Sequence, residues 1–323
     1  MKIFAEKTNF DFMGKSKIAI TLSTLLILAT FYTWFARGDS KYGTDYIGGF
    51  EFVVELDQSV DSDATVKLRE AFQEGGFSDV VVQSYQIGSG KYAIRLPGDV
   101  AKVDTTEVKD SKDENAHTAE IAKKVKAVLQ EAFADKYTML SNSYIGPTIG
   151  NELRWKALTA FIFGLLGITA YITYRFEFAF ALGAVLAVFH DAIVTLGIYL
   201  ALGHDLNMTV LAAVLTIVGY SVNDTIVIFD RVREEVFKRK DYELVPLFNE
   251  CINITLSRTV ITSLLTLFAA VSLLVLGGGA IEDLSLFMVI GILVGAYSTI
   301  FIASPIVVAW ESFMTRKKRA ATA

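Results

Sequence analysis

Residues 208–234 read MTVLAAVLTIVGYSVNDTIVIFDRVRE. The stretch is largely apolar up to Asp230 and Arg231, yet Asp224 lies inside its apolar part. A helix crosses the hydrocarbon core of a bilayer with about 20 apolar residues, and a carboxylate inside that core costs roughly 2.5 to 3.5 kcal/mol on insertion scales. The stretch therefore predicts a membrane-spanning helix whose ionisable side chain needs a partner or a water-lined cavity.

Five further apolar runs are long enough to cross a bilayer, so the sequence predicts a membrane all-α bundle of six transmembrane helices. The composition agrees, because 53% of the residues are hydrophobic and only 20% are charged. The first run ends in Trp34, Phe35, Ala36 and Arg37 without the small-residue pattern of a cleavage site, which indicates a retained helix. The predicted spans are 18–36, 157–174, 178–202, 208–229, 251–276 and 284–309.

Basic residues indicate the side of the membrane that each connection faces. Six spans place both termini on one side, and the excess of Lys and Arg there makes that side the cytoplasm. We therefore expect a cytoplasmic N-terminus at 1–17, an outer domain at 37–156 and a cytoplasmic basic tail at 310–323. Arg154 and Lys156 lie on the outer side, but a long translocated domain crosses largely regardless of its charge. The basic residues are Lys2, Lys7, Lys15 and Lys17 before the first span, Arg231, Arg233, Lys238, Arg239 and Lys240 after the fourth, and 316–319 in the tail.

Residues 37–156 carry an α+β pattern rather than a linker. The order β-α-β-β-α-β is typical of a ferredoxin-like antiparallel sheet backed by two helices, so we expect a periplasmic α+β domain of that kind. Such a sheet can offer a face or an edge to extended polypeptide. The predicted strands are Gly49–Leu56, Val80–Tyr85, Tyr92–Leu96 and Thr138–Ile145; one helix runs from a cap at Asp61 or Ser62 to Glu74, a second covers Ile121–Phe133, and a charged excursion occupies 97–115.

The fifth span carries a candidate partner for Asp224. Arg258 lies in LSRTVITS, residues 256–263, eight positions after Glu250, whereas Asp224 lies seven positions before Arg231. At the rise of an α-helix these depths are about 12 Å and about 10 Å from the membrane edge, so we expect an ion pair between neighbouring helices. The polar residues expected to surround it are Tyr220, Ser221, Asn223 and Thr225.

A second carboxylate, Asp191, follows His190 in the third predicted span. It lies fourteen residues past Glu177, about 21 Å from the cytoplasmic edge and towards the outer half. Two interpretations stay open for it. Asp191 could be an outer proton station, or it could hydrogen-bond Thr or Tyr side chains for packing alone.

Several classes of site find no support in the residues. Cys251 is the one cysteine and the three histidines are not clustered, so we expect neither a disulfide nor a metal site, and no cofactor. The net charge of -5 disfavours nucleic acid as the main partner. HExxH and GxSxG are absent as well, so we expect no enzymatic activity.

Three segments together resemble the SecF family of the bacterial protein-export machinery, which is related to the proton-driven RND transporters. The first is GYSVNDTIVIFDRVRE, residues 219–234, followed by LSRTVITS. The second, DYIGG at 45–49, is similar to the family's Asp-Phe-x-Gly-Gly, with Tyr46 and Ile47 in place of the commoner Phe and Thr. The third is IGPTIG at 145–150, and the resemblance spans nearly the whole chain.

The resemblance implies an auxiliary factor of the bacterial inner membrane. Such a factor pairs with SecD beside the SecYEG channel, with YajC as a further candidate partner, and uses the proton-motive force to draw unfolded preproteins out on the far side. The family's proton path would map onto Asp224 and Arg258. Asp45, Gly48 and Gly49 belong to the family's motif, although the residues themselves indicate only a loop that ties the first span to the sheet.

Three rival functions remain open. A proton-coupled RND-type exporter usually has two six-helix halves and larger outer domains, whereas this sequence has one half. An intramembrane aspartyl protease would use Asp191 and Asp224, but its Gly-x-Gly-Asp pattern is missing because Ser221-Val222-Asn223 precedes Asp224. A scaffold would use the buried charges only to fix helix register, and replacing Asp224 with Asn separates that role from proton transfer.

Overall fold

The computed structural model divides the chain into two compact units. A helical unit comprises Met1–Lys41 and Thr159–Ala323, and a sheet unit comprises Tyr42–Leu158. The sequence predicts its outer domain at 37–156, close to the bounds of the sheet unit. The residues that the structure describes are 8–57, 63–77, 80–84, 90–97, 114–134, 136–239, 241–277 and 279–322.

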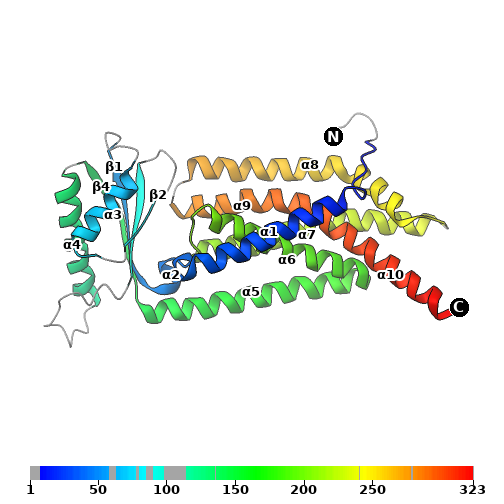
Figure 1. Ribbon diagram of the computed structural model, residues 1–323, viewed down its shortest axis with the longest axis horizontal. Helices are drawn as coiled ribbons and strands as arrows, with labels where there is room; N and C mark the ends of the chain where they lie inside the picture. The colour runs from blue at the N-terminus through cyan, green and yellow to red at the C-terminus, as the bar shows by residue number, and fades with distance from the viewer. Residues whose placement is uncertain are drawn as a thin grey trace. The chain divides into compact units, whose positions relative to one another are not determined.

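Long helices lie side by side in the helical unit (Figure 1). Among the described residues, six helical segments are long and apolar enough to cross a membrane, which confirms the six predicted spans. The last of them, Ala280–Lys317, contains a π-helical turn, η3, at Thr299–Ala303. The helices are α1 (Ser16–Ala36), α5 (Pro147–Arg175, which begins in the sheet unit), α6 (Phe178–Ala201), α7 (Met208–Lys238), α8 (Leu244–Leu276), α9 (Gly279–Ser298) and α10 (Ser304–Thr322).

The fourth span begins where the sequence predicts, but its helix ends later. At its start the Asn207 side chain caps α7 by accepting a hydrogen bond from the Val210 N–H at 2.8 Å. At its end α7 continues from the predicted Phe229 to Lys238, because charged pairs four residues apart support the last turns. Examples are Arg231 with Glu235 at 2.8 Å and Lys238 with Glu234 at 2.8 Å.

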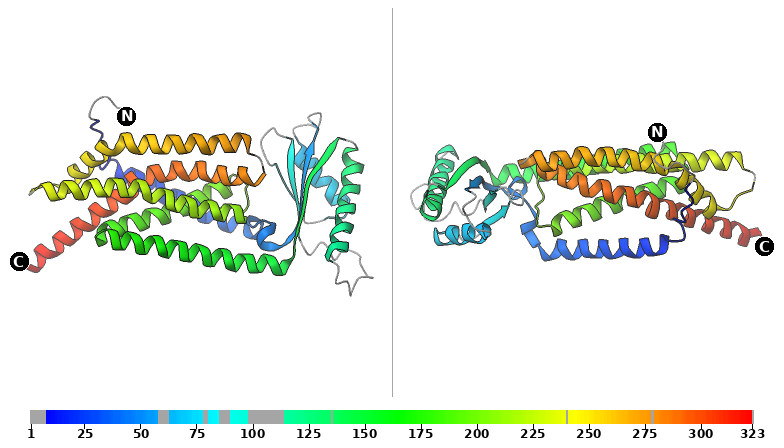
Figure 2. Two further views of the ribbon diagram at one scale, coloured as in Figure 1. Left: turned by 180° about the vertical axis from the view of Figure 1, so that it is seen from behind. Right: turned by 90° about the horizontal axis from the view of Figure 1, so that it is seen from above.

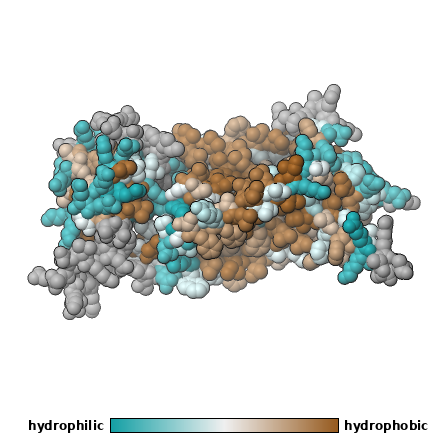
Figure 3. All heavy atoms as spheres, in the orientation of Figure 1, coloured by the Kyte–Doolittle hydropathy of each residue, from teal (hydrophilic) through white to brown (hydrophobic). Residues whose placement is uncertain are grey.

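Three of the spans form the centre of the helical unit and three lie around them. The apolar windows of α6, α7 and the last span are 56%, 50% and 56% buried, whereas those of α1, α5 and α8 are 17%, 11% and 17% buried. Apolar side chains gather in a broad band over the middle of this unit in the space-filling view (Figure 3). The outer helices thus present apolar surface, as expected of helices that face lipid.

Helix α9 packs closely against α7, as the GxxxG spacing of Gly291 and Gly295 predicts for a helix contact. A Cβ atom added at Gly291 would lie 2.6 Å from the Ile217 side chain. One added at Gly295 would lie 3.4 Å from Ser221 and 3.7 Å from an oxygen of Asp191. The small residues therefore let α9 approach the polar part of α7.

The start of α1 and the end of α10 lie at the same end of the helical unit (Figures 1 and 2). The end of α7 and the start of α8 lie at that end too. The described basic residues before α1, after α7 and in α10 therefore share one end, as an even number of spans requires.

The sheet unit is a four-stranded antiparallel sheet in the order β2-β3-β1-β4. Its strands are β1 (Gly49–Leu56), β2 (Val81–Ser84), β3 (Lys91–Pro97) and β4 (Tyr137–Ile145). Helices α3 (Ala64–Glu74) and α4 (Glu114–Phe133) lie against one face of the sheet (Figure 2). In the core, every second residue of β1 packs against one side of each helix. This is the pattern of buried residues that the alternating sequence of β1 predicts. Its fully buried side chains include Phe50, Phe52, Val54, Leu68, Phe72, Val125 and Leu129.

Helix α4 begins earlier than predicted. The sequence assigns 97–115 to an irregular excursion and begins the helix at Ile121, whereas α4 begins at Glu114. Apolar periodicity marks only the buried part of a helix, so a polar first turn is missed. The rest of the excursion at 98–113, the cap at Asp61 or Ser62, Tyr85, and the basic residues Lys2, Lys7 and Lys240 lie outside the described residues.

The two glycine-containing motifs of the sheet unit meet each other. Gly48 and Gly49 have φ angles of +79° and +136°, which a residue with a Cβ adopts only with strain, and they turn the chain from the short helix α2 (Thr44–Ile47) into β1. A Cβ atom added at Gly150 would lie 3.1 Å from the backbone nitrogen of Gly48. This close approach requires glycine for a structural reason, whatever else the motif does.

Candidate functional site

Asp224 is buried in the middle of α7, with 4% of its surface exposed. Its carboxylate accepts hydrogen bonds from two hydroxyl groups of α8, Thr262 Oγ1 at 3.4 Å and Ser263 Oγ at 3.2 Å. Hydrogen bonds to a charged group are the stronger kind, so these donors help to offset the cost of burying the carboxylate. Asp224 therefore lies on the face of α7 that meets α8.

The predicted ion pair between Asp224 and Arg258 is absent from the described part of the chain. Arg258 is exposed on α8, one helical turn before Thr262, and its guanidinium makes no hydrogen bond or ion pair there. The depth estimate was right about the helices but could not fix the direction of either side chain, since depth says nothing about rotation around the helix axis. Hydroxyl groups hold the carboxylate instead.

Asp191 lies in α6 and is completely buried. One carboxylate oxygen contacts His190 Nδ1 at 2.9 Å. The other accepts hydrogen bonds from Ser221 Oγ of α7 and from Ser298 Oγ of α9, the latter at 2.7 Å. The packing interpretation expected Thr or Tyr partners, and the structure provides two serines and a histidine that join the three central spans.

The π-helical turn η3 lies beside this cluster. Thr299, its first residue, follows Ser298 and places its hydroxyl 3.0 Å from the hydroxyl of Thr225 on α7. Thr225 also donates to the backbone oxygen of Ser221 at 3.3 Å. Single π-helical turns occur often at functional sites, and this one meets α7 one residue from Asp224.

The remaining predicted polar residues divide between the two sides of α7. Ser221 and Thr225 are buried against α6 and α9, as described above, whereas Asn223 is exposed. The hydroxyl of Tyr220 is buried and has no hydrogen-bond partner among the residues that the structure describes. Two other buried polar atoms near Asp191 in α6 are also unpaired within the described part of the chain, His190 Nε2 and Thr195 Oγ1, and bound water is one common partner of such atoms.

The structure brings Asp191 and Asp224 into one helical bundle without pairing them. Within the described residues no hydrogen bond joins the two carboxylates, because Asp224 faces the hydroxyls of α8 and Asp191 faces Ser221 and Ser298. A protease dyad that shares a proton needs the two groups in contact, so this arrangement argues against the protease alternative. Among the described residues no group of three or more His, Cys, Asp or Glu is placed to hold a metal ion.

Sequence reasoning missed the hydroxyl partners of both carboxylates. Thr262 and Ser263 stand in the quoted LSRTVITS, but only its arginine was interpreted. Ser298 and Thr299 are two adjacent hydroxyl residues in a largely apolar final span, and this adjacency is the signal that the sequence offers. Hydroxyl groups in a membrane helix usually bond to their own backbone, so their contacts with another helix cannot be recognised without coordinates.

The tyrosine of the DYIGG motif is the notable titratable group of the sheet unit. Burial, together with the neighbouring negative charge of Asp45, raises the pKa of Tyr46 to about 12. Both effects favour the neutral phenol over the phenolate. Tyr46 is therefore neutral at neutral pH, and its ring packs edge-on against that of Tyr42, with the ring centroids 6.3 Å apart.

Taken together, the six spans and the two buried carboxylates define a multi-pass membrane protein with ionisable groups at the centre of its bundle. A family model described as Protein export membrane protein SecD/SecF, C-terminal, matches residues 124–312. The chain is 38% identical over 323 residues to the protein translocase subunit SecF of Magnetococcus marinus, covering 100% of this chain and 99% of that protein. It is 35% identical over 319 residues to the SecF of Calditerrivibrio nitroreducens, covering 98% and 99% of the two chains.

Solved structures of SecDF, a translocon-associated membrane protein, resemble the whole fold. The structure from Thermus thermophilus matches with a TM-score of 0.80 and 33% identity, covering 96% of this chain and 40% of that one. A SecDF structure in a super-membrane-facing form matches with a TM-score of 0.68 and 32% identity, covering 99% of this chain and 41% of that one. The chain thus spans about two fifths of the length of these SecDF chains.

The chain belongs to the SecF family of protein translocase subunits. Membership places it among the auxiliary subunits of the Sec protein-export machinery.

Proposed function

We propose that this subunit uses the proton-motive force to help draw unfolded preproteins across the bacterial inner membrane. In this proposal it pairs with a SecD chain beside the SecYEG channel, with YajC as a further candidate partner. The SecDF structures support the pairing, because their chains are long enough to hold a second part beside the one that this chain matches. The basic residues at one end of the helical unit support cytoplasmic termini, with the sheet unit on the outer side.

One observation carries the proposal: the buried Asp224 is held by hydroxyl groups of a neighbouring helix rather than by a fixed counter-charge. A carboxylate in a tight ion pair loses its affinity for protons, whereas one held by hydroxyls can gain and lose a proton at lower cost. Ionisable residues inside membrane proteins usually line ion or proton pathways. Asp224 is therefore the proposed proton-binding group.

The Thr262 hydroxyl couples the charge of Asp224 to the packing of α7 against α8. Its oxygen lies 3.4 Å from Asp224 Oδ1 but also 3.0 Å from the backbone oxygens of Arg258 and Thr259, and it has one hydrogen to donate. When Asp224 is a carboxylate, that hydrogen is drawn across the helix interface. When Asp224 is protonated, the carboxyl group can donate to Thr262, which then donates to its own helix. Each proton state thus favours a different contact between the two helices.

Arg258 and Asp191 take supporting roles in this proposal. Arg258 stands one turn from the hydroxyl pair, where its positive charge favours the ionised form of Asp224 through space. Asp191 joins α6, α7 and α9. The Thr195 and His190 atoms beside it, which have no partner among the described residues, leave room for water and thus support a proton station. Its contacts on three helices would also transmit a shift of α7 through the bundle.

The free energy available from protons is sufficient for such a switch. A proton that crosses 150 to 200 mV releases roughly 3.5 to 4.6 kcal/mol, because the scale is about 2.3 kcal/mol for each 100 mV. Inverting a two-state population from 1:99 to 99:1 needs about 5.5 kcal/mol. Two protons for each movement would therefore be enough.

We further infer that the sheet unit has the ferredoxin-like arrangement and handles extended polypeptide. The observed strand order β2-β3-β1-β4 with α3 and α4 on one face supports that arrangement. The outer strand β4 is nine residues long, uncharged and mostly exposed, so its free edge could pair with an extended chain. Proton-driven changes in the helices would move this unit between substrate-holding and substrate-releasing positions.

Export by membrane vesicles that contain the full Sec machinery tests the proposal. Asp224→Asn keeps the shape of the side chain and its acceptor oxygen but removes proton binding. We expect the variant to export at the rate that the native protein shows after an ionophore has collapsed the proton gradient. Asp241→Asn makes the same chemical change at an exposed position between α7 and α8, and it should keep the full response to the gradient.

If the Asp224→Asn variant still responded to the gradient as the native protein does, proton transfer through Asp224 would be refuted. A loss of export even without a gradient would indicate the scaffold role instead, in which the carboxylate only fixes the helices.

A further inference from the structure

The residues that precede α1 lie against the first part of α8 (Figure 1). We call residues 8–14 the strap. Two asparagines of α8, Asn249 and Asn253, stand one helical turn apart and hold it. The side chain of Asn253 accepts a hydrogen bond from the Phe10 N–H at 3.0 Å and donates one to the Phe10 carbonyl at 2.9 Å. This reciprocal pair satisfies both backbone groups of one strap residue.

Asn249 binds the strap at three points. Its Oδ1 accepts hydrogen bonds from the backbone N–H groups of Phe12 at 2.9 Å and Met13 at 3.0 Å, and its Nδ2 donates to Asp11 Oδ1 at 2.8 Å. The same Asp11 oxygen accepts a hydrogen bond from the Gly14 N–H at 2.8 Å. The bond from Gly14, and then the bond from Asn249, hold the pKa of Asp11 below its ordinary value of 3.8. The strap therefore keeps its charged carboxylate at neutral pH.

The other side of the strap packs into the helical unit. Met13 is buried in the core of this unit. The ring of Phe12 meets that of Phe301, in the π-helical turn η3, edge-on with the centroids 6.0 Å apart. Phe301 in turn lies 5.3 Å from the ring of Tyr297, whose hydroxyl donates to the backbone oxygen of Ala19 in α1 at 2.6 Å. The strap thus contacts α8 on one side and η3 on the other.

The elements α8 and η3 also flank Asp224. Thr262 and Ser263 of α8 donate hydrogen bonds to its carboxylate. Thr299 of η3 bonds at 3.0 Å to the hydroxyl of the residue that follows Asp224 in α7. Asn253 precedes Thr262 by nine residues of one continuous helix, or about 13 Å along its axis. The strap is therefore bound to the same helix that supplies the hydroxyl partners of Asp224.

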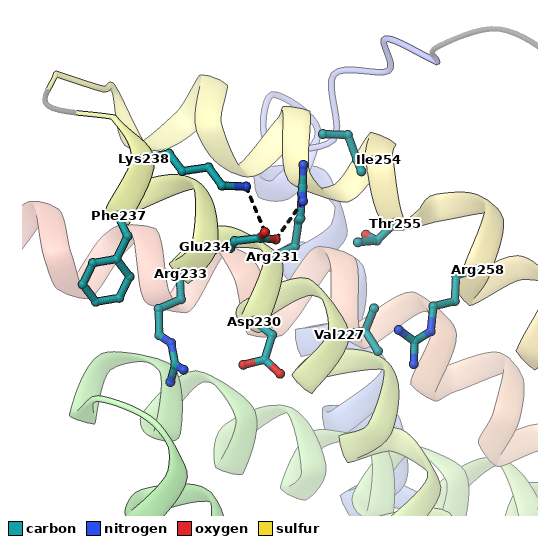
Figure 4. Close-up of a pocket in the computed structure, with 10 residues that line it drawn as sticks. All are labelled: Val227, Asp230, Arg231, Arg233, Glu234, Phe237, Lys238, Ile254, Thr255 and Arg258. Carbon is teal, nitrogen blue, oxygen red and sulfur yellow. Dashed lines mark hydrogen bonds and ion pairs between the residues drawn. The ribbon is translucent and has the colours of Figure 1, made fainter.

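A groove of about 690 Å³ lies between this part of α8 and α7 (Figure 4). Ile254, Thr255 and Arg258 of α8 line it, together with residues of α7 from Val227 to Lys238. Because the side chains of the two helices leave this space between them, packing against α7 alone does not fix the position of this part of α8. The asparagine contacts with the strap fix it from outside the groove.

We propose that the strap positions the hydroxyl pair of α8 against Asp224, with Asn249 and Asn253 as the positioning residues. With the strap bound, as in this structure, Thr262 and Ser263 donate to the carboxylate and favour its charged form. With the strap released, α8 can shift, the hydroxyls move away, and the carboxyl group takes up a proton more readily. The inference rests on the proposed proton binding by Asp224.

Such a coupling between two sites is reciprocal. If release of the strap favours proton uptake by Asp224, then proton uptake must loosen the strap by the same factor. The strap and the carboxyl group can be observed by different methods, so each direction of the coupling has its own measurement.

Hydrogen exchange of the full-length protein in lipid vesicles, read by mass spectrometry, tests the effect of Asp224 on the strap. The N–H groups of Phe10, Phe12 and Met13 are protected by the asparagines. Asp224→Asn offers the α8 hydroxyls a neutral acceptor, so at constant pH it should speed the exchange of residues 8–14 roughly two- to five-fold. Asp241→Asn is the matched control and should leave this exchange unchanged.

The infrared band of the protonated Asp224 carboxyl group tests the opposite direction. Asn249→Ala removes the acceptor of two strap N–H groups, and we expect the pH at which half of the band has appeared to rise by about half a unit to one unit. Asn253→Ala should give a smaller shift of the same sign, and it covers the case in which Asn249→Ala does not fold. Asn151→Ala removes an exposed asparagine of α5 and should leave the band unchanged.

A shift of the band in the strap variants cannot come from a changed charge beside Asp224. The nearest charged and titratable groups on the helices packed around it, within the described residues, are Arg258 on α8 and Asp191 on α6 beyond Ser221. The asparagine variants alter neither of them. A shift would therefore report the positions of the α8 hydroxyls.

If Asn249→Ala and Asn253→Ala left the band at its native pH, the strap would be a purely structural contact and the proposal would be overturned. Unchanged exchange of the strap in Asp224→Asn would overturn it too. A native protein without any band from Asp224 would instead refute the proton binding on which the inference rests, so the two failures are distinguishable.

Discussion

At the scale of single residues, the two buried carboxylates of the helical unit differ in what holds them. Asp191 bonds to side chains on both neighbouring central helices, whereas Asp224 faces the peripheral helix α8 through two hydroxyls at 3.2 and 3.4 Å. The longer bonds and the single partner helix make Asp224 the group whose contacts can change with less disruption of the core. This contrast is the physical basis for assigning the proton-binding step to Asp224.

The bond from Ser263 to Asp224 reports whether that carboxyl group is charged. We predict that Ser263→Ala lowers the free energy of unfolding by about 1.5 to 3 kcal/mol at neutral pH, the range for a hydrogen bond to a charged group. In an Asp224→Asn background the same change should cost only about 0.5 to 1.5 kcal/mol, because the acceptor is then neutral. Denaturation of the purified variants in mixed micelles measures both values as a double-mutant cycle.

Ser272→Ala is the matched control for this cycle. The Ser272 hydroxyl lies on the same helix but donates to the backbone oxygen of Phe268 at an exposed position. Its removal should change the stability little in either background. If Ser263→Ala lowered the free energy of unfolding by the same amount in the native and Asp224→Asn backgrounds, Ser263 would not sense the charge of the carboxylate.

At the scale of elements, sequence patterns located the helices and strands well but fixed their ends only in part. Apolar run length found all six spans, because a bilayer imposes one length on every helix that crosses it. It could not show that α7 continues to Lys238, where charged pairs stabilise the last turns. It also could not show that α8 begins at Leu244, ahead of the charged Glu250 that bounded the predicted span. The π-helical turn at Thr299–Ala303 lies inside a continuous apolar stretch, so the apolar pattern does not distinguish it from ordinary α-helix.

The DYIGG element gives a prediction for alkaline pH. The pKa of Tyr46 is raised from 10.0 to about 12, so the fold favours the neutral phenol. The corresponding stability is fully present below pH 10 and is lost as the pH rises towards about 12. We expect Tyr46→Phe, the residue commoner in the family, to remove this part of the alkaline destabilisation of the sheet unit.

Urea unfolding followed by circular dichroism at about pH 9 and about pH 11.5 measures the effect. The native protein should lose more stability between the two values than Tyr46→Phe does. Tyr137→Phe, in β4 of the same unit, should behave like the native protein. The same pH dependence in the native protein and in Tyr46→Phe would contradict the assignment.

At the scale of the whole molecule, the sequence predicts much of the architecture but not which side chains contact each other across helices. Spans, their number and the α+β character of 37–156 follow from run length and periodicity, which are local properties of the chain. The candidate site depends on rotation about helix axes, which is non-local, so the expected pair of Asp224 with Arg258 was replaced by Asp224 with Thr262 and Ser263. The estimated depths paired α7 with α8, which do contact each other at Asp224, but they could not identify the side chains of α8 that meet it.

The division into two units also has a consequence for function. The buried clusters of the helical and sheet units share no residue, so each unit has a core of its own. Units with separate cores can move as bodies, which the proposed stroke requires. The chain covers about two fifths of the SecDF chains that it resembles, which is why the proposal includes a SecD partner.

Infrared difference spectroscopy of the protein in lipid vesicles tests the central claim most directly, because it detects the proton on Asp224 itself. Lowering the pH on the outer side should produce the stretching band of a protonated carboxyl group, and this band should be missing from Asp224→Asn but present in Asp241→Asn. A spectrum in which Asp224→Asn removes no band that changes with pH would show that Asp224 does not exchange a proton, and the account would be wrong.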